Sequence, residues 1–253
     1  MRIIKAGGAS VEVWPDAESL NGRAAELFTE TARRCVEIEG SFKVALSGGS
    51  TPRSLYELLA SEAYARRTPW AETYVFWSDE RCVPPTSVES NYRMAFNALL
   101  WRVPVPPGQV HRIRGEDDPD KAARDYSRVL REKLDGNPPR FDLILLGLGE
   151  DCHTASLFPN SSAILDVDNY VSAPYVEKLK ARRLTLTFPV INESAGVIFL
   201  VSGESKAEAL RVVLEEEVSG MDYPAQLVSP TGGELIWLID EAAAERLSPS
   251  KKS

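Results

Sequence analysis

Short apolar runs alternate along the chain with longer segments in which apolar residues recur every three or four positions. The first long segment spans residues 16–39, where Asp16 follows Pro15 and precedes apolar side chains at helical spacing. Such spacing is typical of an amphipathic helix, and an aspartate at its start can accept hydrogen bonds from the free N–H groups of the first turn. The pattern predicts a helix that begins after Asp16 and ends near Glu39.

Four apolar runs have the length of buried strands, and polar loops follow them. They span residues 44–46, 74–77, 143–146 and 197–201, and helical spacing resumes after the first, second and fourth. Runs that are continuously apolar, rather than alternating, are typical of strands with helices on both faces. We therefore predict an α/β fold with a doubly wound, mostly parallel sheet and helices on both faces.

Two further strands follow from weaker patterns. Apolar residues alternate with threonines from Leu184 to Phe188, which predicts a strand with one more polar face, and residues 235–239 supply a late strand. Proline-rich pieces such as 103–108 are short enough to be surface connections. The chain should therefore form a single domain over residues 1–247, followed by a frayed tail at 248–253.

Composition and charge restrict what this domain can bind. The 253 residues are 43% hydrophobic and carry a formal net charge of -8, which argues against a general affinity for nucleic acid or for anionic membranes. The longest apolar run, residues 143–148, is too short to cross a bilayer, and the first ten residues lack the apolar stretch of a signal peptide. We expect a cytoplasmic protein in which an anionic ligand needs a local basic pocket. The oligomeric state stays open.

Cysteine and histidine are sparse. Cys35, Cys82 and Cys152 form an odd set that cannot be a disulfide framework, and His111 and His153 do not stand at the spacings of a zinc site. We therefore expect reduced thiols, and neither a metal nor another cofactor.

The loops after the four apolar runs are the place to look for a site, because ligands of open α/β sheets bind beyond the carboxyl ends of the strands. The first loop consists of Ser47, Gly48, Gly49, Ser50 and Thr51. It offers glycines for close backbone approach, hydroxyl donors and a following helix N-terminus, which together suit a phosphate. It is neither a P-loop nor a dinucleotide fingerprint. A plain strand-to-helix turn explains the same residues.

Two basic residues stand near the ends of predicted strands. Lys206 lies in the first turn of a predicted helix, where the helix dipole favours acidic residues, and a bound phosphate would account for it. Arg183 heads the strand that starts at Leu184 and can donate two parallel hydrogen bonds to a phosphate. Ordinary surface charges remain the alternative for both.

Titratable side chains follow the second and third apolar runs. Asp79 and Arg81 follow the second run, in either a solvated turn or a binding site. His153 follows the third run, two residues after Asp151. A histidine in this place can act as a general acid or base near neutral pH while the carboxylate fixes its tautomer. A lone histidine is usually structural, but its place in a ligand-facing loop favours catalysis, and we assign His111 to structure.

Taken in order, these segments resemble the 6-phosphogluconolactonase family, whose superfamily also holds the glucosamine-6-phosphate deaminases. The match runs over nearly the whole chain. It implies a modified Rossmann-like fold and hydrolysis of the phosphorylated lactone made in the first oxidative step of the pentose phosphate pathway. The segments that carry the resemblance are Ser-Gly-Gly-Ser-Thr-Pro (47–52), Ser-Asp-Glu-Arg-Cys-Val-Pro (78–84), Gly-Leu-Gly-Glu-Asp-Cys-His-Thr-Ala-Ser-Leu-Phe-Pro (147–159), Arg-Leu-Thr-Leu-Thr (183–187) with Ile-Asn (191–192), and Ser-Gly-Glu-Ser-Lys (202–206).

The resemblance also implies roles for single residues. His153 would be the catalytic acid and base with Asp151 beside it, and a small phosphorylated sugar lactone would be the binding partner. The family generally has glycine where this chain has Cys152, which leaves the backbone path of that loop open. The residues predicted to bind the substrate are Ser47, Gly48, Gly49, Ser50, Thr51, Asp79, Arg81, Arg183 and Lys206.

Two rival functions remain at this point. A glucosamine-6-phosphate deaminase or another sugar-phosphate isomerase would reuse the phosphate loops, but such deaminases carry a carboxylate soon after the histidine, and residues 154–159 contain none. A sensor that binds a sugar phosphate without turnover would not need the pair formed by Asp151 and His153.

Overall fold

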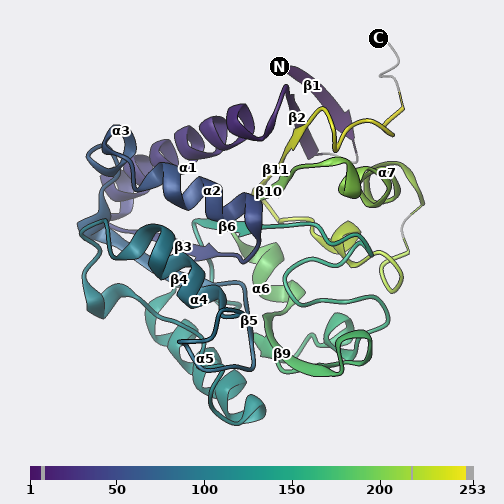
Figure 1. Ribbon diagram of the computed structural model, residues 1–253. Coiled ribbons are helices and arrows are strands. Elements are labelled where there is room, and N and C mark those ends of the chain that lie inside the picture. The colour runs from purple at the N-terminus through teal and green to yellow at the C-terminus, as the bar shows by residue number, and fades with distance from the viewer. Residues whose placement is uncertain (7–8, 218, 249–253) are drawn as a thin grey trace.

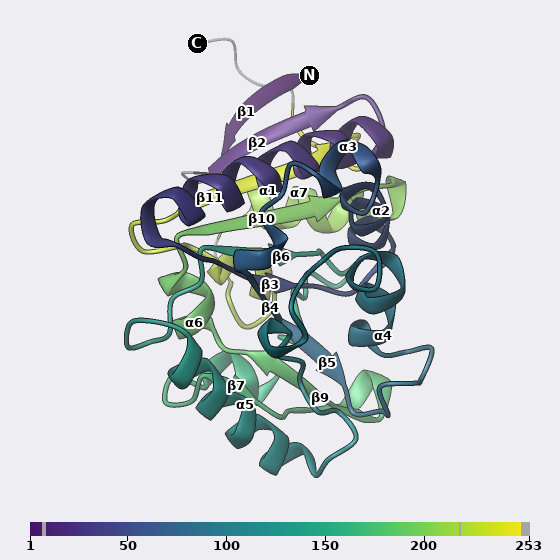
Figure 2. The same ribbon diagram turned by 90° about the vertical axis from the view of Figure 1, so that its left-hand side faces the viewer.

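A seven-stranded sheet forms the centre of the molecule. The structure is a computed structural model, and it describes residues 1–6, 9–217 and 219–248. The strands of the sheet are β1 (Arg2–Ala6), β2 (Ala9–Trp14), β3 (Phe42–Leu46), β4 (Thr73–Trp77), β6 (Leu143–Leu146), β10 (Gly196–Val201) and β11 (Glu234–Asp240). Figure 2 shows them from top to bottom in the order β1, β2, β11, β10, β6, β3, β4. All neighbours are parallel except β1 and β2. The prediction of a mostly parallel sheet is confirmed.

Helices cover both faces of this sheet. Figure 1 shows α1 (Ala17–Glu39) and α2 (Ser50–Leu59) on one side and α6 (Phe188–Glu193) and α7 (Ala207–Glu215) on the other. As predicted, α1 begins after Asp16, whose side chain accepts a hydrogen bond from the Ser19 N–H at 2.7 Å. Every residue of β6 is buried, which is why this strand is apolar throughout.

A smaller antiparallel sheet lies beside the main one. It contains β5 (Asp79–Arg81), β7 (Val171–Ser172) and β9 (Ala181–Leu186), and β8 (Tyr175–Val176) pairs with β9 as well. The interpretation of residues 78–81 as a solvated turn is wrong, because Asp79 and Glu80 are buried.

The predicted strand from Leu184 to Phe188 is wrong at its end. β9 ends at Leu186, and Phe188 is the first residue of α6. The proline that follows Phe188 suits the first turn of a helix, where its missing N–H costs nothing. The alternation of apolar residues could not show where the strand stops.

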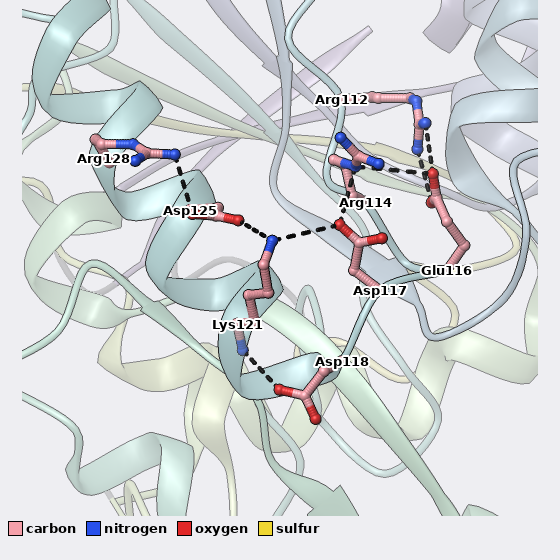
Figure 3. Close-up of polar contacts among 8 residues, drawn as sticks. All are labelled: Arg112, Arg114, Glu116, Asp117, Asp118, Lys121, Asp125 and Arg128. Atoms are coloured by element: carbon pink, nitrogen blue, oxygen red, sulfur yellow. Dashed lines mark hydrogen bonds and ion pairs between the residues drawn. The ribbon is translucent and has the colours of Figure 1, made fainter.

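Helix α5 (Pro119–Lys133) was not predicted, although its start carries a recognisable signal. Asp118 caps the helix by accepting from the Lys121 N–H at 2.9 Å, and Pro119 occupies the first helical position. Figure 3 shows the ion pairs around this start, among them Lys121 with Asp125 at 2.7 Å. The helix packs against β7 and β9, so it supports the strand that carries Arg183.

The remaining elements are short. They are the α-helices α3 (Glu62–Ala65) and α4 (Asn91–Ala95), a π-helical turn (Phe96–Leu100), and 3₁₀ turns at Trp70–Glu72, Pro107–Gln109, Ser162–Leu165, Glu177–Leu179, Glu204–Lys206 and Pro224–Leu227. Within the described residues, no helix is both long and apolar enough to cross a membrane. Beyond Ser248, the predicted frayed tail lies outside the described residues.

The strand order brings the predicted loops together. From β3 the chain passes to β4 on one side, and from β6 it passes to β10 on the other. The loops after β3 and β6 therefore diverge at a topological switch point, where open α/β sheets bind their ligands.

Replacing Asp118 with alanine should lower the free energy of unfolding by about 1 kcal/mol, because the first turn of α5 loses its side-chain cap. Asp118→Asn keeps an oxygen acceptor and should remain near wild type. Urea unfolding monitored by circular dichroism measures both. Equal losses in the two variants would show that the charge network of Figure 3, rather than the cap, holds this helix start.

Candidate active site

Loops from the carboxyl ends of β3, β4, β6 and β10 line a cavity of about 230 Å³, here called the first cavity. A second cavity of about 380 Å³ adjoins it, and the residues that line both are Asp79, Arg81, Gly149, His153, Ala155 and Lys206. Of the predicted site residues, Asp151 and Arg183 line the second cavity alone. Those that line the first cavity alone are Ser47, Gly48, Gly49, Ser50 and Thr51. All the predicted residues thus lie around one continuous space.

The glycines after β3 let the chain turn sharply into α2. Gly49 has φ +108°, a conformation that side chains rarely adopt, and it precedes the first turn of α2 without a side-chain cap. A Cβ added to Gly48 would overlap the side chain of Asn91. The uncapped N–H groups of α2 therefore border the first cavity, in an arrangement that suits an anion.

Asp79 ties three parts of the site together. Its Oδ2 accepts a hydrogen bond from Ser156 Oγ at 2.7 Å, and its Oδ1 accepts one from Asn91 Nδ2 at 3.2 Å. Ser156 belongs to the loop after β6, and Asn91 begins α4 against Gly48. Asn91 lines the first cavity but was not predicted, because only the packing of distant segments reveals its place.

Glu80, on the other face of β5, holds the start of α4 through hydrogen bonds. Its carboxylate accepts hydrogen bonds from the N–H groups of Arg81, Asn91 and Tyr92 and from Ser90 Oγ. Burial raises the pKa of Glu80 in spite of these four bonds. The carboxylate satisfies the free N–H groups at the start of α4 and so fixes Asn91.

Two arginines face each other across the smaller sheet. Arg81 of β5 and Arg183 of β9 are directly paired in the antiparallel register. Their guanidinium groups donate only to backbone carbonyls within the described residues, Arg81 to Glu89 O at 2.6 Å and Arg183 to Arg182 O at 3.1 Å. Burial and then the charge of Arg81 lower the pKa of Arg183. Like charges in this register repel each other, so an anion between them would be stabilising.

His153 is held by its own loop. The loop closes through hydrogen bonds from Gly149 N to His153 O at 2.8 Å and from Cys152 N to Gly149 O at 3.0 Å. The imidazole stacks on Phe158 with ring centres 4.1 Å apart, and its Nδ1 is hydrogen-bonded to Asp151 Oδ1. A Cβ on Gly149 would overlap the ring. Packing and hydrogen bonding therefore define the orientation of the ring.

The charge state of Asp151 determines which imidazole nitrogen carries the proton. Burial acts to raise the pKa of Asp151, but hydrogen bonds from His153 and Lys178 outweigh it and hold that pKa well below its usual range. An ionised carboxylate only accepts hydrogen bonds, so Nδ1 must be the donor. Nε2 is then free to accept a proton.

Lys206 lies at the end of the turn that connects β10 to α7. Asp240, at the end of β11, accepts hydrogen bonds from Ser202 Oγ and from the Gly203 N–H and so fixes the start of this turn. The Nζ atom of Lys206 is 3.9 Å from Glu150 Oε1, too long for a hydrogen bond. Its ammonium group remains available to a ligand in either cavity.

The other candidates for chemistry point away from both cavities. Cys152 has φ +63°, and its buried Sγ donates to Ala209 O at 3.7 Å. Burial, with the charges of Asp151 and Glu208, raises the pKa of Cys152 to about 11, so the thiol stays protonated. His111 packs on Phe76 with ring centres 4.9 Å apart and lines neither cavity.

Comparison with known proteins shows the family to which the chain belongs. Residues 15–237 match the family described as Glucosamine-6-phosphate isomerases/6-phosphogluconolactonase. The chain is 39% identical to 6-phosphogluconolactonase of Nostoc sp. and 40% identical to that of Synechocystis sp., in each case over 94% of this chain and 98% of the relative. A solved structure of 6-phosphogluconolactonase from Trypanosoma brucei is similar with a TM-score of 0.85 at 27% identity, over 95% of this chain and 99% of that one. The resemblance noted in the motifs is confirmed.

The left-handed backbone at Cys152 predicts an unusual order of stabilities. Cys152→Ala and Cys152→Gly both lose the buried sulfur, but only glycine also removes the Cβ that disfavours a positive φ. The alanine variant should therefore be the less stable of the two by about 1 kcal/mol. Chemical denaturation of both variants tests this order, and an alanine variant as stable as the glycine variant would contradict it.

Proposed function

The chain belongs to the glucosamine-6-phosphate isomerase/6-phosphogluconolactonase family, and from this membership we propose that it hydrolyses 6-phospho-D-glucono-1,5-lactone to 6-phosphogluconate in the pentose phosphate pathway. The observation that carries the proposal is the pair formed by His153 and Asp151, which borders the same space as the anion-binding loop and four cationic side chains. Relatives named 6-phosphogluconolactonase match over nearly the full length.

His153 serves as both base and acid in the proposed reaction. Its Nε2 removes a proton from a water molecule as the water oxygen bonds to the lactone carbonyl carbon. The tetrahedral intermediate then breaks its bond to the ring oxygen, and the imidazolium returns the proton to that oxygen. Asp151 stabilises the imidazolium in between. Cys152 is not the nucleophile, because its protonated thiol faces Ala209 rather than the cavities.

The basic side chains have two further functions in the proposed reaction, which are to bind the phosphate and to stabilise the oxyanion. We assign the phosphate to the N–H groups and hydroxyls of residues 48–51, with Lys206 and Arg183 closing around it. Arg81 lines both cavities beside His153, which makes it our candidate for stabilising the oxyanion of the intermediate. Asp79 and Asn91 can accept hydrogen bonds from sugar hydroxyls as well as supporting the loops.

Glucosamine-6-phosphate deaminases carry a carboxylate soon after the histidine, and this chain has none in that segment. Thr154 and Ser156 occupy the segment after His153, and both have structural partners: Thr154 Oγ1 donates to Gly147 O at 3.0 Å, and Ser156 Oγ donates to Asp79. Neither can replace an acid that moves protons between carbon atoms.

Incubation with freshly generated 6-phosphogluconolactone distinguishes the functions. The proposal predicts acid release well above the spontaneous rate and no ammonia from glucosamine 6-phosphate. Release of ammonia would identify a deaminase instead, and binding of the lactone without acceleration would identify a sensor. Either result would refute the proposed function.

The variant His153→Ala should lower kcat by about 100-fold or more, since one group performs both proton transfers. The kcat of the wild type should fall as the pH is lowered, because the base becomes protonated. The kcat of the variant should not show this pH dependence. His111→Gln is the matched control, because that imidazole lines neither cavity. Steady-state kinetics across pH measures all three proteins. A near-normal kcat in His153→Ala would exclude the assigned role.

The variants Lys206→Ala and Arg183→Ala should raise KM more than they lower kcat, because phosphate binding is largely shared by the ground and transition states. Arg182→Ala is the control for Arg183, since the Arg182 side chain instead pairs with Asp120 at 2.9 Å. The wild type should strongly prefer the phosphorylated lactone over gluconolactone, and both site variants should lose much of that preference. Equal efficiency of the wild type on the two lactones would rule out the phosphate assignment.

A further inference from the structure

We propose that Lys178 is a positioning residue for His153, acting through the carboxylate that the two side chains share. Lys178 Nζ donates to Asp151 Oδ2 at 2.9 Å, while Asp151 Oδ1 is hydrogen-bonded to Nδ1 of the imidazole. One carboxylate oxygen thus contacts Lys178 and the other contacts His153, so the three side chains form a chain from ammonium to imidazole. The inference rests on the proposed function, because it concerns the base of that reaction.

Lys178 reaches Asp151 from a separate part of the fold. It lies on the turn Glu177–Leu179, between β8 and β9, and the left-handed residue Lys180 (φ +47°) ends that turn. The polar contacts that Asp151 makes within its own loop are both with His153, through the backbone N–H and through Nδ1. Among the described residues, Lys178 therefore supplies the contact that joins this carboxylate to the rest of the protein.

The second contact limits how Asp151 can move. A carboxylate held by His153 at one oxygen alone can rotate about its side-chain bonds and release Nδ1, whereas one held at both oxygens cannot do so without breaking a charged hydrogen bond. Burial raises the pKa of Asp151, and the hydrogen bond from Lys178 adds to that from His153 in lowering it. Both effects keep the Nδ1 proton in place and direct Nε2 towards the cavities.

The size of the effect is set by exposure. The Lys178 side chain is 67% exposed and that of Asp151 is 23% exposed, so solvent weakens the attraction between them. We therefore expect a contribution to orientation and charge rather than a large contribution to stability. The other charged groups that line the cavities around His153 are Asp79, Arg81, Glu150, Arg183 and Lys206.

The kinetic test compares Lys178→Met with Lys180→Met, a neighbouring lysine on the same turn. Lys178→Met should lower kcat by about fivefold, the order of magnitude of an exposed ion pair, and leave KM for the phosphorylated lactone within about twofold. Loss of the positive charge makes protonation of the imidazole easier, so the acid limb of the kcat profile should move to higher pH. Lys178→Arg should restore the wild-type profile, and Lys180→Met should match wild type.

A double-mutant cycle isolates the path through Asp151. In an Asp151→Asn background the amide has no charge to pair with Lys178, so adding Lys178→Met should change neither kcat nor its pH profile further. Independent, multiplying effects would overturn the proposal. A rise in KM with unchanged kcat would also overturn it, because Lys178 would then be a substrate-binding residue.

An NMR titration keeps this inference separate from the proposed function. The chain has two histidines, so His111→Gln leaves the imidazole of His153 as the single one to follow. Adding Lys178→Met should move the midpoint of that titration to higher pH, with or without lactone turnover. An unshifted midpoint would refute the role of Lys178. A shifted midpoint in a protein that does not hydrolyse the lactone would refute the function and leave the positioning contact standing.

Discussion

The arrangement of the site depends on one buried carboxylate, that of Asp79. Its two oxygens accept from Ser156, in the loop that carries His153, and from Asn91, which packs against Gly48. A buried carboxylate that loses a partner is costly, so these contacts fix the distance between the candidate base and the anion-binding loop. Loops after three different strands, which otherwise share only the edge of a sheet, become one rigid wall of the two cavities.

Repulsion among clustered positive charges is a second constraint, and it destabilises the folded protein when no anionic ligand is bound. In a chain of net charge -8, Arg81 and Arg183 are paired across two strands, and Lys206 lines both cavities with them. Holding these cations together is unfavourable in the free protein and becomes favourable when a phosphate or an oxyanion lies between them. Binding selectivity therefore follows from local placement rather than from overall charge.

Much of this could be predicted from the sequence, because local signals carry it. Continuous apolar runs mark β3, β4, β6 and β10, Asp16 caps α1, and every predicted site residue borders at least one of the two cavities. What was missed depends on contacts between distant segments. Asn91 and Lys178 lie in unremarkable polar stretches and enter the site only because Asp79 and Asp151 lie opposite them in the fold. The end of β9 was misplaced because alternation continues into the first residue of α6. The start of helix α5, by contrast, carries a capping signal that can be recognised in the sequence.

The central claim is that substrate lies with its phosphate at the loop after β3 and its reacting carbon beside His153. A crystal structure with bound 6-phosphogluconate, the product, tests this most directly. The account predicts phosphate oxygens within hydrogen-bond distance of the N–H groups of residues 49–51 and of Lys206, and a carboxylate next to Nε2 of His153. The opposite orientation, with the carboxylate at the glycine loop and the phosphate at the imidazole, would contradict it.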